Sequence, residues 1–314
     1  MDTAPRTASV SSLPLSVNFH LWEPCNMRCR FCFATFQDVK QTVLPRGHLP
    51  REQAVAVVEQ LAAAGFDKIT FAGGEPTLCP WIGELIERAK QRGLTTMLVT
   101  NGSRLLTPGW LEQHAAALDW VVISIDSADP RTHERLGRSI AGQTGRALTA
   151  EHYQAAAATL HARGVRLKVN TVVTTLNAEE DLSELILALR PERWKALQVL
   201  PVAGQNDGKV EELLIDELTF RRFCARHQRV ADAGIALVPE DNEDMTGSYA
   251  MVDPAGRFFD NTTGSHSYSR PILDVGVDAA WQDIRFEARR FAERGGVYDW
   301  RPPSRDLVPL RRAR

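Results

Sequence analysis

The stretch EQAVAVVEQLAAAGFDKITFAGG, residues 52–74, contains the pattern from which the fold is predicted. An alanine-rich segment typical of a helix ends at Gly65, and a short β-branched run typical of a strand follows it. Glycine suits this position because it adopts the left-handed conformation that closes many helices. The pattern recurs at residues 84–102 and 151–173, with Gly93 and Gly164 in the equivalent places. Helices and strands alternating in this way predict a parallel sheet with right-handed crossovers, closed or partly closed into a barrel.

Three further strands are predicted at residues 16–22, 120–127 and 195–202, with a helix at 178–189 before the last of them. The expected fold class is therefore α/β, a partial (β/α)6 barrel of the TIM type with an α+β extension over its open side. In that extension, residues 237–249 and 272–280 are expected to line the site. The expected division of the chain is a disordered lead at 1–14, the barrel at 15–200, a cap at 201–300 and a flexible basic tail at 301–314.

The composition is that of a soluble globular protein, with 44% apolar and 24% charged residues among 314. A net charge near -2 gives no strong field for nucleic acid, and no run approaches the roughly 18 apolar residues that a membrane span needs. The first residues lack the apolar core of a secretory signal. We therefore expect a monomer in the cytoplasm that binds neither nucleic acid nor a membrane.

Three of the five cysteines lie together in CNMRCRFC, residues 25–32, directly after the first predicted strand. Thiolates from Cys25, Cys29 and Cys32 can hold three corners of a four-iron four-sulfur cluster and leave the fourth iron open for another ligand. A structural zinc site normally has a fourth Cys or His at paired spacing, and Cys79 and Cys224 have no C-x2-C partner. A non-catalytic, zinc-binding interaction protein is kept as an alternative.

Glycine and polar residues follow several predicted strands, where the chemistry of α/β barrels is found. These positions are Gly73 to Pro76, Asn101 to Ser103, Ser124 to Ser127 and Asn170 to Val173. Because the carboxyl ends of parallel strands meet at one end of a barrel, these residues are expected to surround one site with the cysteine loop.

The cysteine spacing, with Phe31 before the last cysteine, resembles that of the radical S-adenosylmethionine (SAM) enzymes. The resemblance implies that the open iron binds the amino and carboxylate groups of SAM, and that reductive cleavage yields a 5′-deoxyadenosyl radical. It implies two cofactors, the 4Fe-4S cluster and SAM. The residues that match SAM contacts in the family are Phe31, Gly73, Gly74, Glu75, Asn101, Ser124, Asp126 and Arg138.

Longer stretches resemble the viperin-like group of these enzymes, in order, from about residue 16 to residue 300. They include residues 16–36, 67–78 and 270–281. The resemblance implies a lyase that dehydrates a ribonucleoside triphosphate to its 3′-deoxy-3′,4′-didehydro analogue, a chain terminator used in antiviral defence. CTP is the first expectation for the substrate, with UTP and GTP open, and the electron donor is expected to be of the flavodoxin or ferredoxin type. A radical SAM enzyme acting on a peptide or small molecule is kept as a second alternative.

Several residues match substrate contacts in the resembled group. Four cations, Lys68, Lys168, Arg193 and Lys195, match phosphate contacts, and clustered Lys and Arg suit a triphosphate with its roughly four negative charges. Asn18 matches a position near the base, and Asn170 shares the strand face of Lys168. Tyr249 matches a tyrosine that delivers a hydrogen atom late in the reaction. Taken singly, each cation is more typical of a solvated surface than of a phosphate site.

Overall fold

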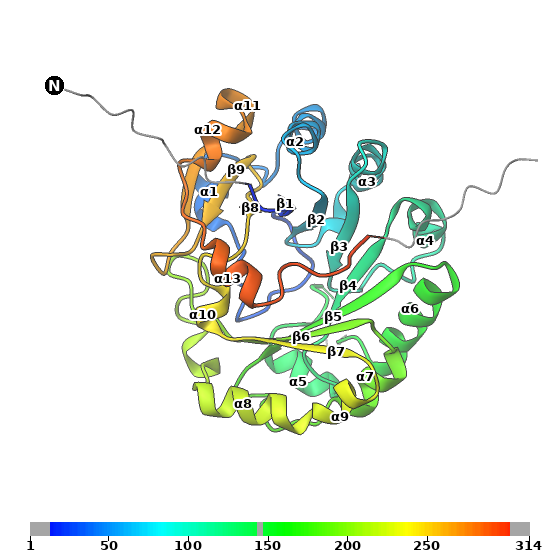
Figure 1. The fold of residues 1–314 in the computed structure, drawn as a ribbon. Coiled ribbons are helices and arrows are strands. Elements are labelled where there is room, and N and C mark those ends of the chain that lie inside the picture. The colour runs from blue at the N-terminus through cyan, green and yellow to red at the C-terminus, as the bar shows by residue number, and fades with distance from the viewer. Residues whose placement is uncertain (1–12, 143–146, 302–314) are drawn as a thin grey trace, which may run out of the picture.

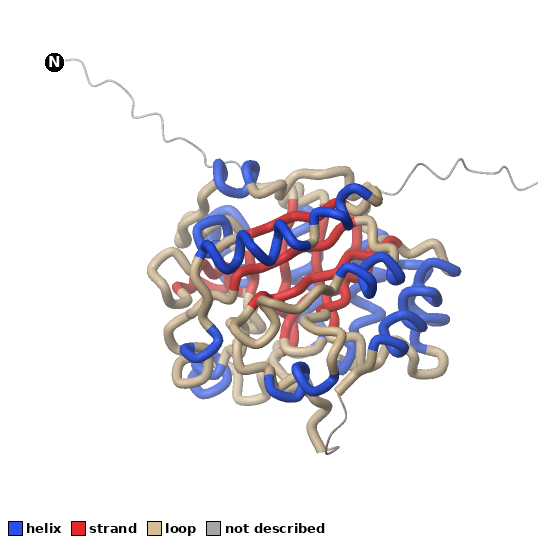
Figure 2. Tube along the Cα trace, turned by 90° about the horizontal axis from the view of Figure 1, so that it is seen from below, coloured by secondary structure: helices blue, strands red, loops and turns tan. Residues whose placement is uncertain are grey.

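The computed structural model describes residues 13–142 and 147–301, so the predicted lead and tail lie almost entirely outside the described residues. One ten-stranded sheet forms the centre of the molecule, in the order β10-β9-β8-β1-β2-β3-β4-β5-β6-β7. Figure 1 shows this sheet curving around the centre with helices on its outside, and Figure 2 shows the same arrangement from below. The described residues include no helix long and apolar enough to cross a membrane.

The six predicted strands are present, pair in sequence order and run parallel. They are β1 (Ser16–Trp22), β2 (Lys68–Gly73), β3 (Thr95–Thr100), β4 (Trp120–Ser124), β5 (Arg166–Val173) and β6 (Arg193–Gln198). The helices between them are α1 (Gln37–Thr42), α2 (Arg51–Ala63), α3 (Ile82–Gln91), α4 (Trp110–His114), α5 (Pro130–Arg135), α6 (Ala150–Ala162) and α7 (Ser183–Leu189). This arrangement confirms the prediction of a partial α/β barrel.

The predicted helix ends are confirmed at the three glycines. Gly65, Gly93 and Gly164 have φ angles of 95°, 83° and 68°, in the left-handed region where glycine carries no steric penalty. The helices they follow bury narrow apolar stripes against the sheet; α2, for example, buries Val57 and Leu61 completely.

The helix predicted at 178–189 is shorter in the structure and begins at Ser183. Before it, the Asn177 amide donates to the carbonyl of Val172 at 2.9 Å and its oxygen accepts from the amide of Thr174 at 2.7 Å. These side-chain bonds stabilise a turn in place of the first helical turn, because Asn competes well for backbone groups.

The carboxyl-terminal third adds strands to both edges of the barrel sheet. It contributes β7 (Ala236–Glu240), parallel to β6, and β8 (Met251–Val252), parallel to β1, and β8 is followed by antiparallel β9 (Arg257–Asp260) and β10 (Ser267–Pro271). Its helices are α8 (Glu217–Arg226), α9 (Gln228–Asp232), α10 (Asn242–Met245), α11 (Ile272–Val275), α12 (Val277–Trp281) and α13 (Ala288–Glu293). Short 3-10 turns occur at Pro76–Leu78, Ala115–Ala117 and Glu211–Leu213. The extension is therefore continuous with the barrel sheet.

Alternate residues of each strand face opposite sides of the sheet. On β1, Val17, Phe19 and Leu21 are buried in the apolar core, whereas Asn18 and His20 line a central cavity. Two layers result, an apolar one beneath the helices and a polar one around the barrel axis.

Candidate active site

The central cavity has a volume of about 660 Å³, within the usual range for small-molecule sites. Every site residue predicted from the sequence lines it, except Glu75 and Arg193. The prediction that residues 272–280 line the site is wrong, because α11 contacts α2 and α12 contacts β9 and β10, and no residue of that range borders the cavity. Of residues 237–249, Met245 and Tyr249 do line it.

The three clustered cysteines lie at the carboxyl end of the barrel, in the loop after β1, and all are free thiols. Burial raises the pKa of Cys25 to about 11 and that of Cys32 to about 12, and it also raises the pKa of Cys29. The thiols are therefore protonated when no metal is bound, and metal binding releases their protons.

The cysteine loop is held by close backbone contacts with two other segments. The amide of Arg28 donates to the carbonyl of Gly137 at 3.0 Å, and the amide of Gly74 donates to the carbonyl of Trp22 at 2.6 Å. A Cβ atom on Gly137 would lie 2.2 Å from the Arg28 oxygen, and one on Gly74 would lie 2.1 Å from the Glu23 oxygen. These glycines are required because the loop leaves no room for a side chain.

The donor set fits an iron–sulfur cluster. Within residues 13–142 and 147–301, no three His, Cys, Asp or Glu side chains converge as a single metal ion requires. In a four-iron cluster each thiolate binds a different iron, so the three sulfur atoms need not converge on one point. A guanidinium nitrogen of Arg138 lies 3.8 Å from the Cys29 sulfur, where its charge favours the thiolate form. Cys25, Cys29 and Cys32 would hold the cluster.

Glu75 lies behind the cavity wall and joins the ends of β2 and β3. Its carboxylate is 1% exposed and accepts hydrogen bonds from the Thr77 amide at 3.0 Å, the Thr100 hydroxyl at 2.8 Å and the Asn101 amide at 2.7 Å. Burial raises its pKa in spite of these bonds. The carboxylate therefore positions Thr77, Thr100 and Asn101, and ligands would meet the backbone of Gly73 and Gly74 instead.

Asp126 and Arg138 form a buried ion pair at the ends of β4 and β5. Arg138 Nε lies 3.0 Å from Asp126 Oδ2, and Arg138 also donates to the Ser124 carbonyl at 2.6 Å. The other Asp126 oxygen accepts from the Val172 amide at 2.7 Å. Burial raises the pKa of Asp126, although the Arg138 charge acts in the opposite direction. The pair fixes the Ser124 backbone next to the cysteine loop.

Cationic side chains gather at the opposite, amino-terminal end of the barrel strands. Lys68 and Arg193 are the first residues of β2 and β6, and Lys168 is paired in register with Arg193. Burial and the neighbouring cations lower the pKa of Lys68 and Lys168 well below the ordinary lysine value. Among the described residues, neither lysine forms an ion pair with a carboxylate. The group, called the cation cluster below, comprises Lys68, Lys168, Arg193, Lys195 and Arg294.

One carboxylate, that of Glu240 at the end of β7, is buried against the cation cluster. It pairs with Lys195, and Arg294 Nη1 lies 3.2 Å from it. Tyr249 completes this corner, because its hydroxyl donates to Glu240 and lies 3.0 Å from the Lys195 ammonium. Among the described residues, Glu240 is the one carboxylate that forms an ion pair with members of the cation cluster.

The segment from Gly295 to Arg301 covers the amino end of the barrel. Lys68 lies 4.4 Å from the Trp300 ring centroid, and the Arg193 guanidinium lies 4.4 Å from the Tyr298 ring centroid. The Trp120 indole donates to the Trp300 carbonyl at 2.9 Å, which fixes this segment across β4. The cation cluster is therefore shielded from solvent on its outer side.

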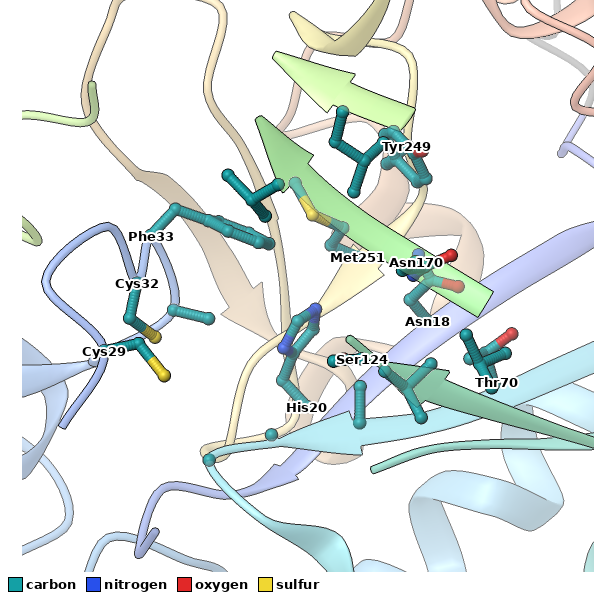
Figure 3. Close-up of a pocket in the computed structure, with 18 of the residues that line it drawn as sticks. Asn18, His20, Cys29, Cys32, Phe33, Thr70, Ser124, Asn170, Tyr249 and Met251 are labelled. Atoms are coloured by element: carbon teal, nitrogen blue, oxygen red, sulfur yellow. The ribbon is translucent and has the colours of Figure 1, made fainter. Parts of the chain in front are cut away.

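Between the two ends, the cavity wall carries amide side chains. Asn18 and Asn170 both line the cavity, and Figure 3 shows their side chains between Tyr249 and His20, with Cys29 and Cys32 on the far side of His20. The Asn170 side-chain oxygen is buried and has no hydrogen-bond partner among the described residues. A buried unpartnered oxygen of this kind favours a polar ligand at the centre of the cavity.

Sequence reasoning missed Glu240, Arg294 and Tyr298. All three come from the extension, where no periodic pattern indicates which side chains face inward. Arg294 follows the short helix α13, and only the folded chain brings it to Glu240, which is far away in the sequence.

The comparisons with known proteins agree with this geometry. The chain is 51% identical over 286 residues to the S-adenosylmethionine-dependent nucleotide dehydratase of Flammeovirga pacifica, covering 91% of this chain and 96% of that one. It is 36% identical to S-adenosylmethionine-dependent nucleotide dehydratase RSAD2 of Danio rerio, covering 91% and 78%. The model of the radical SAM superfamily matches residues 22–189. The chain belongs to the nucleotide dehydratases of the radical SAM superfamily. This confirms the family resemblance found in the sequence.

The chain is about as similar to a relative that is longer than itself. The nucleotide dehydratase of Lacinutrix mariniflava is 50% identical over 295 residues, and the chain spans 60% of its length. Among solved structures, Streptococcus suis SuiB bound to S-adenosylmethionine has a TM-score of 0.66 at 16% identity, covering 90% of this chain and 68% of that one. Escherichia coli HemN, a radical SAM enzyme, has a TM-score of 0.58 at 12% identity, covering 91% and 76%. These two structures support the fold.

Proposed function

We propose that this radical SAM protein dehydrates a ribonucleoside triphosphate to its 3′-deoxy-3′,4′-didehydro analogue. The names of its relatives support a nucleotide substrate. The observation that carries the proposal is the cation cluster. Four of its five members line the same cavity as the cysteine loop, at the opposite end.

The charge of the cation cluster matches a triphosphate. Five cations against the single carboxylate of Glu240 leave an excess of positive charge that a ligand with roughly four negative charges would offset. Leaving Lys68 and Lys168 buried without counterions is costly for folding, and such a cost is typical of a site built for an anion.

The length of the strands sets the distance between the two ends of the site. Lys68 and Gly73 are the first and last residues of β2, and five steps of about 3.3 Å separate them by roughly 16 Å. With phosphates at Lys68, the ribose would lie near Asn18 and Asn170, between the cation cluster and the cysteine loop.

The residues at the cysteine end fit the cluster and SAM. Cys25, Cys29 and Cys32 would hold three irons, and the backbone near Gly73 and Gly74 would receive SAM next to the Asp126–Arg138 pair. When bound, these groups supply a 5′-deoxyadenosyl radical that can remove a hydrogen atom from an unactivated carbon. The removal of the ribose C4′ hydrogen, loss of the 3′ hydroxyl as water and delivery of one electron and one proton would complete the reaction.

Tyr249 is the residue proposed to take part in the last step. It lines the cavity, and its hydroxyl lies at the junction of the cavity and the cation cluster. Burial raises its pKa well above the ordinary phenol value, so it is protonated at neutral pH and able to give up both an electron and a proton.

CTP is the first substrate to test, with UTP and GTP next. An electron donor of the flavodoxin or ferredoxin type would supply the reducing equivalents, and the chain-terminating product would act in antiviral or antiphage defence. We place this chemistry in the cytoplasm.

The test is anaerobic reconstitution of the cluster, followed by reduction with SAM and each of the four ribonucleoside triphosphates in turn. We expect 5′-deoxyadenosine formation to be stimulated by one nucleotide, with a new nucleotide lighter by one water. SAM cleavage without any change in the four nucleotides would retain the radical chemistry and refute the proposed substrate class.

A further inference from the structure

Glu240 is the buried group whose contacts the proposed reaction does not yet use. It is 0% exposed, and its carboxylate accepts a hydrogen bond from the Tyr249 hydroxyl. Lys195 pairs with the same carboxylate and lies 3.0 Å from the Tyr249 oxygen. The Arg294 guanidinium lies 3.6 Å from the Tyr249 ring centroid. The phenol is thus held between two cations with its proton directed to a carboxylate.

We propose that Glu240 takes the phenolic proton of Tyr249 while the electron from that phenol passes to the substrate. This inference rests on the proposed function and deepens it. Glu240 acts through Tyr249 and does not border the cavity itself, so its role is that of a proton acceptor for the redox-active residue.

The reduction of the sugar by Tyr249 balances in atoms and electrons. After the C4′ hydrogen is removed, the 3′ hydroxyl takes a proton from solvent and leaves as water, and the sugar is then one electron short of the product. Tyr249 supplies that electron, its O–H bond breaks, and an O–H bond forms on Glu240. The phenoxyl radical is later reduced by a one-electron donor of the flavodoxin or ferredoxin class, and Glu240 returns the proton. The net change is one electron moved from the donor to the sugar.

The surroundings of Tyr249 require the proton to leave with the electron. An oxidised phenol that kept its proton would carry a positive charge beside Lys195 and Arg294 in a buried site, where repulsion is strong. Transfer to Glu240 avoids this charge, because the phenol becomes a neutral radical and the carboxylate a neutral acid.

The acidity of Glu240 does not prevent the transfer. Burial raises its pKa, but Lys195 and Arg294 lower it more, to about 2. An oxidised phenol is a much stronger acid than any carboxylic acid, so the carboxylate still accepts the proton. Lys168, Arg193 and Asp244 are the other charged groups near this corner, and none of them donates a hydrogen bond to Tyr249 among the described residues.

A second tyrosine–carboxylate pair in the chain provides a matched control. The Tyr268 hydroxyl hydrogen-bonds with the Asp38 carboxylate, and neither residue lines the cavity. The test therefore compares Glu240→Gln, Glu240→Asp, Asp38→Asn and Tyr249→Phe.

The first readout uses the metal-free protein and a photochemical one-electron oxidant. The phenoxyl signal that Tyr249→Phe abolishes belongs to Tyr249. We expect this signal to form in the wild-type protein at a rate independent of buffer concentration. In Glu240→Gln the rate should fall at least tenfold and rise with buffer concentration, because external base replaces the lost acceptor. Glu240→Asp should restore part of the rate, and Asp38→Asn should not change it.

The second readout uses the reconstituted enzyme. Glu240→Gln should cleave SAM but yield at least tenfold less dehydrated nucleotide per 5′-deoxyadenosine than wild type. Its nucleotide affinity should be equal or higher, because the cation cluster gains net positive charge. Loss of affinity alone, with an unchanged product ratio, would indicate an electrostatic role and refute the inference.

Failure of the proposed function and failure of the proton-transfer inference would give different results. If the wild-type enzyme dehydrates no nucleotide, the proposed function fails, whereas the phenoxyl measurement still tests the proton step. If Glu240→Gln forms the Tyr249 phenoxyl at the wild-type rate, the inference is overturned whatever the substrate. Should Glu240→Gln fail to fold, a wild-type phenoxyl rate in Glu240→Asp would be taken as the refuting result, because the shorter side chain separates the carboxylate from the phenol.

Discussion

Replacing Lys168 by Met should stabilise the free protein and weaken nucleotide binding at the same time. Lys168 is 7% exposed, its nearest charged neighbours include Lys68, Lys195 and Arg193, and it forms no ion pair among the described residues. Methionine fills a similar volume without an amine, so the substitution removes a buried group whose charged form is disfavoured by burial and by neighbouring cations, and it leaves no large cavity.

The magnitude follows from the composition of the cation cluster. The cost of holding the Lys168 amine next to like charges is on the order of 1–3 kcal/mol at an effective dielectric constant of about 20, whether it appears as repulsion or as loss of the proton, and Glu240 offsets part of it. We expect the free energy of unfolding to rise by about 1–3 kcal/mol, an increase of roughly 1–5 °C in Tm for a chain of this size. Loss of one buried charge contact should weaken nucleoside triphosphate binding by about 3 kcal/mol, or roughly 100-fold in Kd.

The assay is thermal unfolding of the metal-free protein, with nucleotide affinity measured by calorimetry on the same samples. Lys90→Met is the matched control, because Lys90 pairs at 2.5 Å with the buried Asp119, outside the cavity. That variant should lose stability and keep its nucleotide affinity. A Lys168→Met protein that is less stable than wild type, or that binds nucleotide equally well, would refute the reasoning.

Three further predictions concern the cluster site and the cation cluster. Cys32→Ala should lower bound iron from about four atoms per chain to near zero after reconstitution, whereas Cys224→Ala should not; equal iron in both would contradict the assignment. Gly74→Ala should destabilise the protein by about 2 kcal/mol or more and reduce iron loading, because its Cβ would lie 2.1 Å from the Glu23 oxygen; unchanged melting and iron content would count against it. Nucleotide binding should take up protons, because burial and neighbouring cations lower the pKa of Lys68 and Lys168 in the free protein and the anion raises it. Affinity should therefore fall as pH rises toward the ordinary lysine pKa, and calorimetry in two buffers that shows no proton uptake would be inconsistent with this.

The barrel could be predicted because its signals are local. A helix that ends at Gly65 and a strand that begins at Lys68 are specified by neighbouring residues, and so is the cysteine loop after β1. Site residues placed at strand ends follow from the same topology, since parallel strands bring their carboxyl ends together.

The strands of the extension could not be predicted because their pairing is not local. β7 contains Pro239, which lacks an amide proton and argues against a strand in sequence. It is tolerated because β7 is the last strand in the order and needs hydrogen bonds on one side only. β8, with two residues, is too short for any periodicity.

Within the site, the roles of Glu75 and Arg294 also depend on non-local contacts that the sequence does not predict. The sequence motif predicts that Glu75 contacts the ligand. Its carboxylate instead accepts hydrogen bonds from Thr77, Thr100 and Asn101. Arg294 reaches the cation cluster only because α13 and the following segment cross the end of the barrel (Figure 1). Which charged side chains contact one another in a buried site depends on tertiary packing, and the spacing of residues along the sequence does not reveal it.

The most direct test of the proposed reaction is the fate of the ribose C4′ hydrogen. The reconstituted enzyme would be given the preferred ribonucleoside triphosphate carrying deuterium at C4′, and the mass of the 5′-deoxyadenosine would be measured. We predict one deuterium in 5′-deoxyadenosine and none in the dehydrated nucleotide. Unlabelled 5′-deoxyadenosine alongside a product that keeps its deuterium would contradict the account.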